Sequence, residues 1–455
     1  MNESEKEMLR EVAGRIWSVE IKGVSIDSRN IQEGELFIAL KGDRFDGHDF
    51  VPDAIKKGAW GALVERSALE QKFSNISVLK NILPVEDTLY ALQEMAHLHR
   101  KKFTIPIIGI TGSNGKTTTK EMLASILKQK GPVLKNEGNL NNHIGVPLTL
   151  LKMNGTHWAG VLEMGMSALG EIDSLSRLVM PTVGMITNIG PAHLEFLGTM
   201  DKVALAKGEL LDNLKSEATA VLNADDDYFG FLKKRFAGRL VTFGVANKAD
   251  VTATDVRQGI EYSDMAIEAG GVRINIRLRA VGTHNVYNAL AAAAAALAVG
   301  VPIDIVKFGL DDFLPIAGRS EIKKIEGRTV LADYYNANPA SMEAAIKTLV
   351  SLKSGRKAIA VVGDMLELGE ASAEAHREVG RTAARFKVDL LIMIGEQASY
   401  VERGALESGM KKEQVLGATS RENAGRLLKQ LTHPGDVILI KGSRGMKMEK
   451  ILEAF

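Results

Sequence analysis

The chain has 455 residues, of which 45% are hydrophobic and 25% charged, and its formal net charge is +1. These proportions are typical of a globular protein with two to four domains and exclude a wholly disordered chain. The near-zero charge without a basic block argues against nucleic acid or a membrane surface as a partner, and the absence of cysteine excludes disulfides and zinc–thiolate sites.

Residues 1–103 predict a small α/β domain. Apolar runs in VSIDSRNIQEGELFIALKG are punctuated by glycines, FDGHDF marks a turn, and DTLYALQEMAHLHRKKF has a helical pattern. The stretch MNESEKEMLR lacks the apolar core of a signal peptide. The longest small-apolar run, Ala289 to Gly300, is too short and too rich in alanine to span a bilayer. We therefore expect a cytoplasmic protein without a membrane span.

Residues 104–315 predict a parallel α/β domain. IPIIGI, WAGVLEM, TVGMITNI and ATAVLNA are strand candidates, and an amphipathic helix runs from Lys116 to Lys130. Strands that alternate with helices indicate a doubly wound sheet, which binds ligands at the carboxyl ends of its strands. From Val241 to Arg279 we expect antiparallel strands, and the alanine-rich helix then closes the region.

Residues 316–455 predict a second α/β unit. RTVLAD, KAIAVVGDM, VDLLIMIG and DVILIKGS are strand candidates, each followed by a helical run. Pro339 suits the first position of a helix, with Asn338 as its cap. The fold class that follows is α/β with three domains, since about 140 residues suffice for an independent unit.

The stretch GITGSNGKTTTKEML, residues 109–123, lies between a strand candidate and a helix, as a phosphate-binding loop does. Ile110 replaces the first glycine of the general motif, whereas Gly112, Gly115, Lys116 and Thr117 remain. Backbone amides at the helix start would bind phosphate oxygens, Lys116 would neutralise β/γ charge, and Thr117 would hold Mg²⁺. The alternative is a glycine-rich turn with an exposed lysine.

The loop alone leaves the destination of the phosphate open. A kinase acting on a hydroxyl needs a carboxylate base, and a motor ATPase needs a residue that positions water. An enzyme that phosphorylates a carboxylate needs neither, because its nucleophile is already ionised. Glu163 at the end of WAGVLEM could reach a metal, and His193 beyond the next strand could ligate a second one. A solvated strand-end carboxylate and a structural loop histidine are the alternatives.

These residues resemble the Mur ligases, which build the peptide of bacterial peptidoglycan. The loop TGSNGKT matches that family's phosphate motif, which also lacks the first glycine. Five further blocks follow in order along nearly the whole chain: DSRNIQEGELFIALKGDRFDGHDF, NLNNHIGVPLTLL, the Glu163 and His193 blocks, GTHNVYNALAAAAA, and DYYNANPASM with VVGDMLELGE. YNANP and GDMLELG resemble the member that completes the peptide, and the H-T-P and N-P-R motifs of the diaminopimelate- or lysine-adding relative are absent.

The resemblance implies three domains with separate tasks: an N-terminal domain for the uridine nucleotide, a central P-loop-like domain for ATP, and a C-terminal Rossmann-like domain that closes over both. It implies ATP-dependent phosphorylation of the terminal carboxylate of UDP-N-acetylmuramoyl-tripeptide, followed by attack of the D-alanyl-D-alanine amine. The products would be the pentapeptide precursor, ADP and phosphate. It also implies Mg²⁺, two ions in our interpretation. We expect a monomer.

The resemblance also carries over to individual positions. It implies catalytic roles for Lys116, Glu163, His193, Lys207 and Arg319. It places ATP at Gly112, Ser113, Asn114, Gly115, Lys116, Thr117, Thr118, His284, Asn285, Asn288, Arg319 and Asp333. It implies metal ligation by Thr117, Glu163, His193 and Lys207, the last as a carbamate formed with CO₂. It implies substrate contacts at Ser28, Arg29, Asn139, Asn142, Tyr335, Asn336 and Asn338.

Several of these positions have simpler interpretations that stay open. Lys207 could be an exposed helical lysine, His284 and Asn288 could cap the alanine-rich helix, and Arg319 could be a surface arginine. Asparagines such as Asn139 serve turns. Ala332 and Tyr334 depart from the family's usual pattern around the acidic position. At the level of function, folylpolyglutamate synthase, another amino-acid-adding relative, and an inactive nucleotide-binding module are the competing hypotheses.

Overall fold

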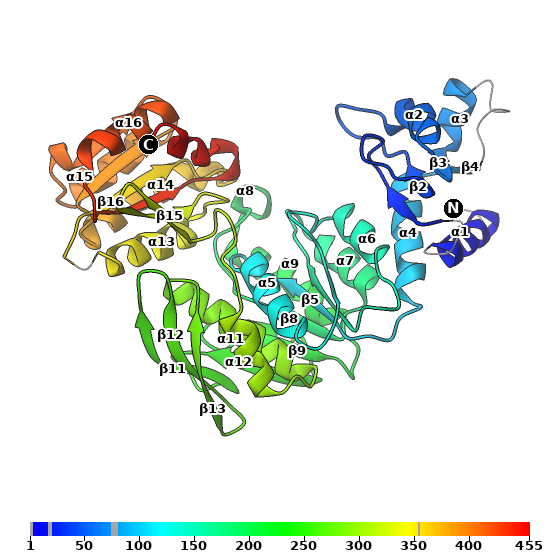
Figure 1. Ribbon diagram of the computed structural model, residues 1–455, viewed down its shortest axis with the longest axis horizontal. Helices are drawn as coiled ribbons and strands as arrows, with labels where there is room; N and C mark the ends of the chain where they lie inside the picture. Colours follow the sequence, from blue (N-terminus) through cyan, green and yellow to red (C-terminus); the bar gives the residue numbers. More distant parts are fainter. Residues whose placement is uncertain (1–2, 17–20, 74–80, 354) are drawn as a thin grey trace.

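The computed structural model describes residues 3–16, 21–73, 81–353 and 355–455. Residues 1–2, 17–20 and 74–80, within the predicted first domain, and residue 354, within the third, lie outside the described part. The chain forms three lobes, each with its own sheet, and the central lobe lies between the other two (Figure 1). The predicted α/β fold class is confirmed.

The first lobe contains a four-stranded sheet in the order β1-β2-β3-β4, with all neighbours parallel. Its elements are α1 (Glu3–Arg15), β1 (Gly23–Ser25), β2 (Glu35–Ile38), the 3₁₀ helix η1 (Gly47–Phe50), α2 (Val51–Lys56), β3 (Gly61–Glu65), α3 (Arg66–Lys72), β4 (Ile82–Val85) and α4 (Thr88–Arg100). The side chain of Asp87 caps α4 by accepting from Tyr90 N, which fixes where the helix begins.

The central lobe contains a nine-stranded sheet in the order β13-β12-β11-β10-β9-β8-β5-β7-β6. Its strands are β5 (Ile107–Thr111), β6 (Val133–Lys135), β7 (Ala159–Glu163), β8 (Val183–Ile186), β9 (Thr219–Asn223), β10 (Arg239–Gly244), β11 (Val251–Gln258), β12 (Ser263–Ala269) and β13 (Val272–Leu278). Its helices are α5 (Lys116–Leu127), α6 (Gly145–Leu150), α7 (Glu171–Val179), α8 (Leu194–Leu197), α9 (Met200–Asp212), α10 (Phe229–Lys233), α11 (Thr283–Ala298) and α12 (Ile303–Asp311).

The insertion after residue 241 differs in part from the prediction. Strand β10 pairs in parallel with both β9 and β11, so the parallel sheet extends further than expected, and only β11, β12 and β13 pair antiparallel. The prediction of antiparallel strands from Val241 onward is therefore wrong for the first part of this segment. The alternation of apolar residues indicates a strand, but it contains no information on which neighbour the strand joins.

The third lobe contains a six-stranded sheet in the order β14-β15-β19-β16-β17-β18, parallel except for the edge strand β14. Its strands are β14 (Glu321–Ile325), β15 (Arg328–Asp333), β16 (Ala358–Gly363), β17 (Leu390–Ile394), β18 (Val415–Ala418) and β19 (Val437–Lys441). Its helices are α13 (Pro339–Ser351), η3 (Gly369–Ala371), α14 (Ser372–Arg385), α15 (Ala398–Glu407), η4 (Lys412–Gln414), α16 (Arg421–Leu431), η5 (Arg444–Met446) and η6 (Met448–Glu453).

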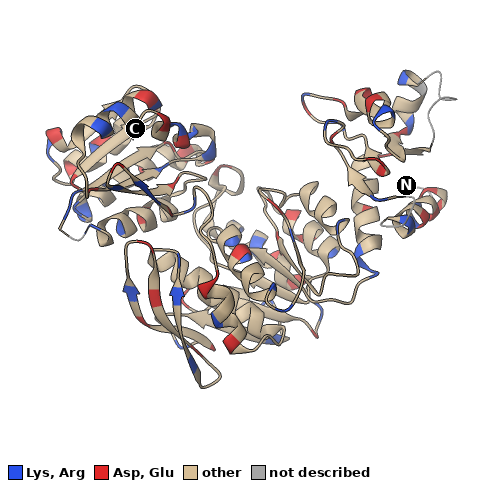
Figure 2. Cartoon of the chain, viewed as in Figure 1, with Lys and Arg blue, Asp and Glu red and all other residues tan. Residues whose placement is uncertain are grey.

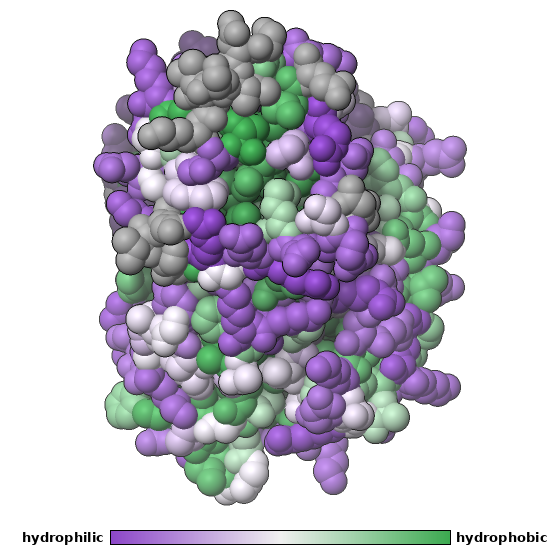
Figure 3. Space-filling view, turned by 90° about the vertical axis from the view of Figure 1, so that its right-hand side faces the viewer, coloured by the Kyte–Doolittle hydropathy of each residue, from purple (hydrophilic) through white to green (hydrophobic). Residues whose placement is uncertain are grey.

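In the view of Figure 2, acidic and basic residues are interspersed on all three lobes. Seen from the side of the first lobe, hydrophilic residues form a broad band across the middle of the molecule, and apolar residues gather in its upper part (Figure 3). Within the described ranges, no helix combines the length and the apolar character that crossing a bilayer requires.

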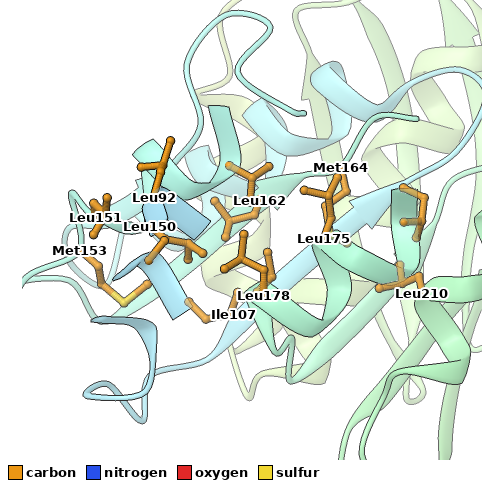
Figure 4. Packing of buried hydrophobic residues seen from close by; sticks show 14 of the residues in the cluster. Leu92, Ile107, Leu150, Leu151, Met153, Leu162, Met164, Leu175, Leu178 and Leu210 are labelled. Carbon is orange, nitrogen blue, oxygen red and sulfur yellow. The ribbon is translucent and has the colours of Figure 1, made fainter. Parts of the chain in front are cut away.

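The central strands are buried on both faces, which explains why they form continuous apolar runs. Ile107 and Leu162 pack into one core with α4, α6, α7 and α9, whereas Ile108 and Val161 pack into another with α5, α11 and α12. Figure 4 shows Leu92 of α4 packing in the first of these cores, close to side chains of the central lobe. The last helix of the first lobe is therefore part of the central core.

Polar contacts reinforce this junction. Arg100 is 5% exposed and donates to the carbonyls of Val179, Met180 and Phe103. His99 bonds the carbonyl of Met153 through Nε2 at 2.7 Å. Because a buried guanidinium is tolerated only when its donors are satisfied, these contacts fix α4 on the central lobe.

Candidate active site between the central and third lobes

The loop between β5 and α5 has the geometry that phosphate binding requires. Gly112 and Gly115 have φ values of 146° and 82°. A Cβ on Gly112 would lie 1.9 Å from Thr187 Oγ1, and one on Gly115 would lie 2.2 Å from Asn288 Oδ1. Both positions therefore need glycine, for conformation and for space. The first turn of α5 leaves its backbone amides at the loop, where a helix N-terminus attracts an anion.

Lys116 lies beside this loop and is not the exposed lysine of a simple turn. Its Nζ donates to Gly112 O at 2.8 Å. Burial lowers the pKa of Lys116, nearby Glu163 opposes that effect, and nearby Arg319 adds to it. Two cations and one carboxylate therefore share a small volume, which suits a site that binds a multiply charged anion.

Glu163 ends β7 and is 3% exposed, so it is not a solvated cap. Its Oε2 accepts from Thr117 Oγ1 at 2.8 Å, and its Oε1 accepts from Asn141 Nδ2 at 2.7 Å. The hydroxyl and the carboxylate that the sequence suggests as Mg²⁺ ligands are thus in direct contact. Hard oxygen ligands of this kind are those that Mg²⁺ prefers.

His193 and Lys207 lie near Lys116. His193 has a left-handed backbone (φ 56°), and its Nδ1 lies 2.8 Å from Glu367 Oε2 of the third lobe. Lys207, in α9, is 2% exposed, so the exposed-lysine interpretation is wrong. Burial and the charge of Lys116 bring the pKa of Lys207 well below its usual range. Burial and the charge of Lys207 in turn lower the pKa of His193.

No group of three or more His, Cys, Asp or Glu side chains suited to a metal ion occurs among the described residues. Mg²⁺ commonly uses one or two protein carboxylates and completes its shell with phosphate oxygens and water. The pair of Thr117 and Glu163 meets that requirement.

The start of α11 lines the site beside the phosphate loop. Gly282 is the N-cap residue of α11, and no side chain caps this helix. The interpretation of His284 and Asn288 as capping residues is therefore wrong. Asn288 Oδ1 instead accepts from Thr119 Oγ1 at 3.3 Å, which joins α11 to α5. His284 Nε2 lies 3.1 Å from Ser320 Oγ, at the connection to the third lobe.

The third lobe contributes Arg319 and the segment 333–338. The Arg319 guanidinium lies over the Tyr335 ring with 3.9 Å between Cζ and the ring centroid. Its buried Nε has no hydrogen-bond partner among the described residues, which suits a side chain that awaits an anion. Asn338 caps α13 as predicted, and its Nδ2 also donates to Asn114 Oδ1 at 2.8 Å. This bond connects the phosphate loop to the third lobe.

These groups surround one cavity of about 730 Å³. Of the residues singled out from the sequence, those lining it are Ser113, Asn114, Gly115, Lys116, Thr117, Thr118, Asn142, Glu163, His193, Lys207, His284, Asn285, Asn288, Arg319, Asp333, Tyr335, Asn336 and Asn338. Gly112 does not line the cavity, but its backbone conformation shapes the loop. A second cavity of about 780 Å³ lies between α4 and α7 and shares Asn142, His143, Gly165 and Glu171 with the first. The two therefore adjoin.

The other predicted contacts lie elsewhere. Asn139 is exposed and lines neither cavity. Ser28 is buried in the first lobe, and Arg29 is exposed and pairs with Asp27, whose pKa it lowers to about 2. Neither lines the two cavities.

The lining residues that were missed in the sequence include Asp225, Tyr287 and Lys441. Asp225 accepts from the backbone amides of residues 245–247 and from Tyr287 Oη, and burial together with this bond raises the pKa of Tyr287. Lys441 ends β19 and pairs with Asp333 at 2.6 Å. The rule that polar residues at strand ends belong to the site, which selected Glu163, also applies to the end of DVILIKGS and would have found Lys441.

Comparison with known families gives matches along most of the chain. Residues 20–100 match the family model described as "Mur ligase family, catalytic domain", residues 110–296 match "Mur ligase middle domain", and residues 318–444 match "Mur ligase, glutamate ligase domain".

Individual proteins match over nearly their full length. A UDP-N-acetylmuramoyl-tripeptide–D-alanyl-D-alanine ligase of Bacillus subtilis is 38% identical, covering 95% of this chain and 93% of that protein. The Escherichia coli protein of the same name is 35% identical over 96% and 94%. A MurF crystal structure from Acinetobacter baumannii matches with a TM-score of 0.88 at 32% identity, over 99% of this chain and 97% of that one. A MurF structure from Thermotoga maritima in complex with ADP has a TM-score of 0.84 at 31% identity, over 95% and 96%. A folylpolyglutamate synthase of Mycobacterium tuberculosis, at 15% identity and a TM-score of 0.65 over 80% of this chain and 94% of that one, shares the fold alone.

Proposed function

Because this chain belongs to the Mur ligase family, we propose that it is an ATP-dependent ligase that joins D-alanyl-D-alanine to UDP-N-acetylmuramoyl-tripeptide. The observation that carries the proposal is the near full-length similarity to enzymes of that name, at up to 38% identity. The YNANP and GDMLELG segments, which the sequence links to this member, line the site or lie beside it.

The chemistry follows from an ionised nucleophile. The terminal carboxylate of the tripeptide attacks the γ-phosphorus of ATP, ADP leaves, and an acyl phosphate forms. The dipeptide amine then attacks the acyl carbon, phosphate leaves, and an amide bond and a proton result. Both reactants of the first step are anions, so the site must supply positive charge. Lys116 and Arg319 face the same cavity and supply it.

We propose that Thr117, Glu163, His193 and a carbamylated Lys207 hold two Mg²⁺ ions. Oxygen ligands at Thr117 and Glu163 and the neutral imidazole favoured at His193 support this set. When bound, the ions would neutralise charge between carboxylate and γ-phosphate. The hydrogen bond from Asn141 would keep the carboxylate of Glu163 in a fixed orientation.

Carbamylation of Lys207 is supported by its surroundings. A buried ammonium beside Lys116 is disfavoured, so the neutral amine, which is the form that attacks CO₂, gains population. The product is a carbamate anion with loss of one proton. The charge at this position is thereby reversed, and its interaction with Lys116 becomes favourable.

We further propose domains at 1–103, 104–315 and 316–455 that bind the uridine nucleotide, ATP and the dipeptide side respectively. Ser28 and Arg29 would contact the uridine diphosphate. The adjoining cavity between α4 and α7 supports a path for the peptide past Asn142. The contact proposed for Asn139 rests on the family resemblance alone. His284, Asn285, Asn288 and Asp333 would hold the adenosine, and Tyr335, Asn336 and Asn338 the acceptor. We also propose that the protein is a monomer, and that it works in the cytoplasm, where ATP is available.

The proposal is tested by measuring ADP release with ATP, Mg²⁺ and UDP-N-acetylmuramoyl-tripeptide, with and without D-alanyl-D-alanine. We expect ADP release to depend on the dipeptide. Mass spectrometry should show a product heavier than the tripeptide substrate by two alanine residues. Replacement of the dipeptide by glutamate should give no product. ADP release that ignores the dipeptide, or product with glutamate, would favour another ligase of the superfamily, and no release at all would favour an inactive nucleotide-binding module.

A further inference from the structure

Lys441 is a buried cation at the end of β19, with 2% of its surface exposed. Strand β19 pairs in parallel with β15, and the register places Lys441 opposite Asp333, the last residue of β15. Its Nζ donates to Asp333 Oδ2 at 2.6 Å and to Asn336 O at 2.9 Å. Burying an ammonium group is costly unless it is paired and hydrogen-bonded, and Lys441 makes both kinds of contact.

The second oxygen of Asp333 holds a strained turn. Asp333 Oδ1 accepts from Ser320 N at 2.9 Å. Ser320 has a left-handed backbone with φ 50°, which is unfavourable for a serine, and Gly318 before it has φ 70°. Tyr335 N donates to Gly318 O at 3.0 Å. One end of the turn 318–320 is therefore bonded to the last residue of β15, and the other end to the segment that follows it.

Arg319 lies in the middle of this turn, and its guanidinium lies over the ring of Tyr335. The backbone on one side of the stack is held by Asp333 through Ser320 N. The backbone on the other side is held by Lys441 through the carbonyl of Asn336, the residue after Tyr335. Lys441 therefore holds the backbone on both sides of the Arg319–Tyr335 stack. It bonds the carbonyl of Asn336 directly, and it reaches Ser320 through Asp333.

We propose that Lys441 is a positioning residue for the ligase reaction, and that it holds Arg319 toward the γ-phosphate through Asp333, Ser320 and Asn336. The inference rests on the proposed function. Lys441 acts through Arg319, so its loss should affect the phosphoryl-transfer step more than the affinity for ATP.

The test is a double-mutant cycle in the full-length enzyme with Lys441→Met and Arg319→Ala. We expect Lys441→Met to lower kcat about 10- to 100-fold, since a displacement of about 1 Å has effects of that size, and to change KM for ATP less than about threefold. Lys441→Met combined with Arg319→Ala should have the kcat of Arg319→Ala alone, because both changes remove the same interaction. Lys347→Met, an exposed lysine on α13, is the matched control and should keep the wild-type kcat.

A second variant separates positioning from loss of folding. Lys441→Met leaves Asp333 without its cation, which destabilises, whereas Asp333→Asn combined with Lys441→Met removes both charges and is expected to restore the melting temperature. We expect the kcat of this neutral pair to stay low and to equal that of Asp333→Asn alone. A neutral pair or a folded Lys441→Met enzyme with wild-type kcat would overturn the inference, as would additive effects with Arg319→Ala. Wild-type enzyme that ignores D-alanyl-D-alanine would instead contradict the proposed function.

Discussion

Replacing Lys116 by alanine is expected to lower kcat for ADP formation by about 10²- to 10³-fold, the effect of removing one charged group that faces developing charge. Lys116 begins α5, its Nζ bonds the carbonyl of Gly112, and it shares the cavity with Arg319 and Glu163. Without it, a carboxylate would have to approach the γ-phosphate with one cation fewer. Single-turnover formation of ADP from ATP and the tripeptide measures this step separately from product release.

Lys128→Ala provides the control for Lys116→Ala. Lys128 follows the last turn of the same helix, and its side chain is 53% exposed. We expect its rate to remain within about twofold of the wild type, because exposed ion pairs contribute little. A Lys116→Ala enzyme that retained the wild-type rate would remove the phosphate loop from the mechanism.

Lys207→Ala is expected to lower kcat by a similar factor, about 10²- to 10³-fold, and to abolish a carbamate signal. Wild-type enzyme incubated with ¹³C-bicarbonate should show one carbamate carbonyl resonance by ¹³C NMR, and the variant should show none. The reason is physical, since a buried ammonium next to Lys116 is disfavoured and a carbamate anion is not.

The matched control is Lys202→Ala, because Lys202 lies on the same helix but is exposed. It should leave both the rate and the resonance unchanged. Full activity of Lys207→Ala at low bicarbonate would exclude the carbamate, and a resonance that persists in this variant would assign it to another lysine.

The sequence predicted the phosphate loop well because its information is local. Gly112 and Gly115 require unusual backbone angles, and Lys116 follows them at the start of a helix, so a short segment contains the whole pattern. Glu163 was found by an equally local rule, since it ends an apolar run that became β7. The strands β5, β7, β8 and β9 were predicted for the same reason, because strands buried on both faces are continuous apolar runs.

Contacts between segments that are far apart in the sequence could not be predicted in this way. The pairing of Lys441 with Asp333 depends on β19 lying next to β15, although about a hundred residues separate them in the sequence. The bond from Asn338 to Asn114 depends on how the third lobe sits on the central one. The partly buried edge strand β14 was also missed, because its apolar residues are few. Non-local pairing is the information that a single sequence does not display.

The structure decides between the alternative interpretations of individual residues on different grounds. Burial decided Lys207 and Glu163, and helix geometry excluded capping by His284 and Asn288. Asn338 does cap its helix and also contacts the phosphate loop, so both of its interpretations hold. Ser28 and Arg29 lie in another lobe, and their roles stay predictions.

The central claim is that the γ-phosphate passes to a carboxylate, and isotope transfer tests it most directly. The tripeptide substrate is labelled with ¹⁸O in its terminal carboxylate, and the enzyme turns over with ATP, Mg²⁺ and D-alanyl-D-alanine. Expulsion of phosphate from an acyl phosphate must carry away the bridging oxygen. We therefore predict one ¹⁸O in each released phosphate by mass spectrometry. Unlabelled phosphate from tripeptide-dependent turnover, or phosphate labelled only when the water contains ¹⁸O, would contradict the account.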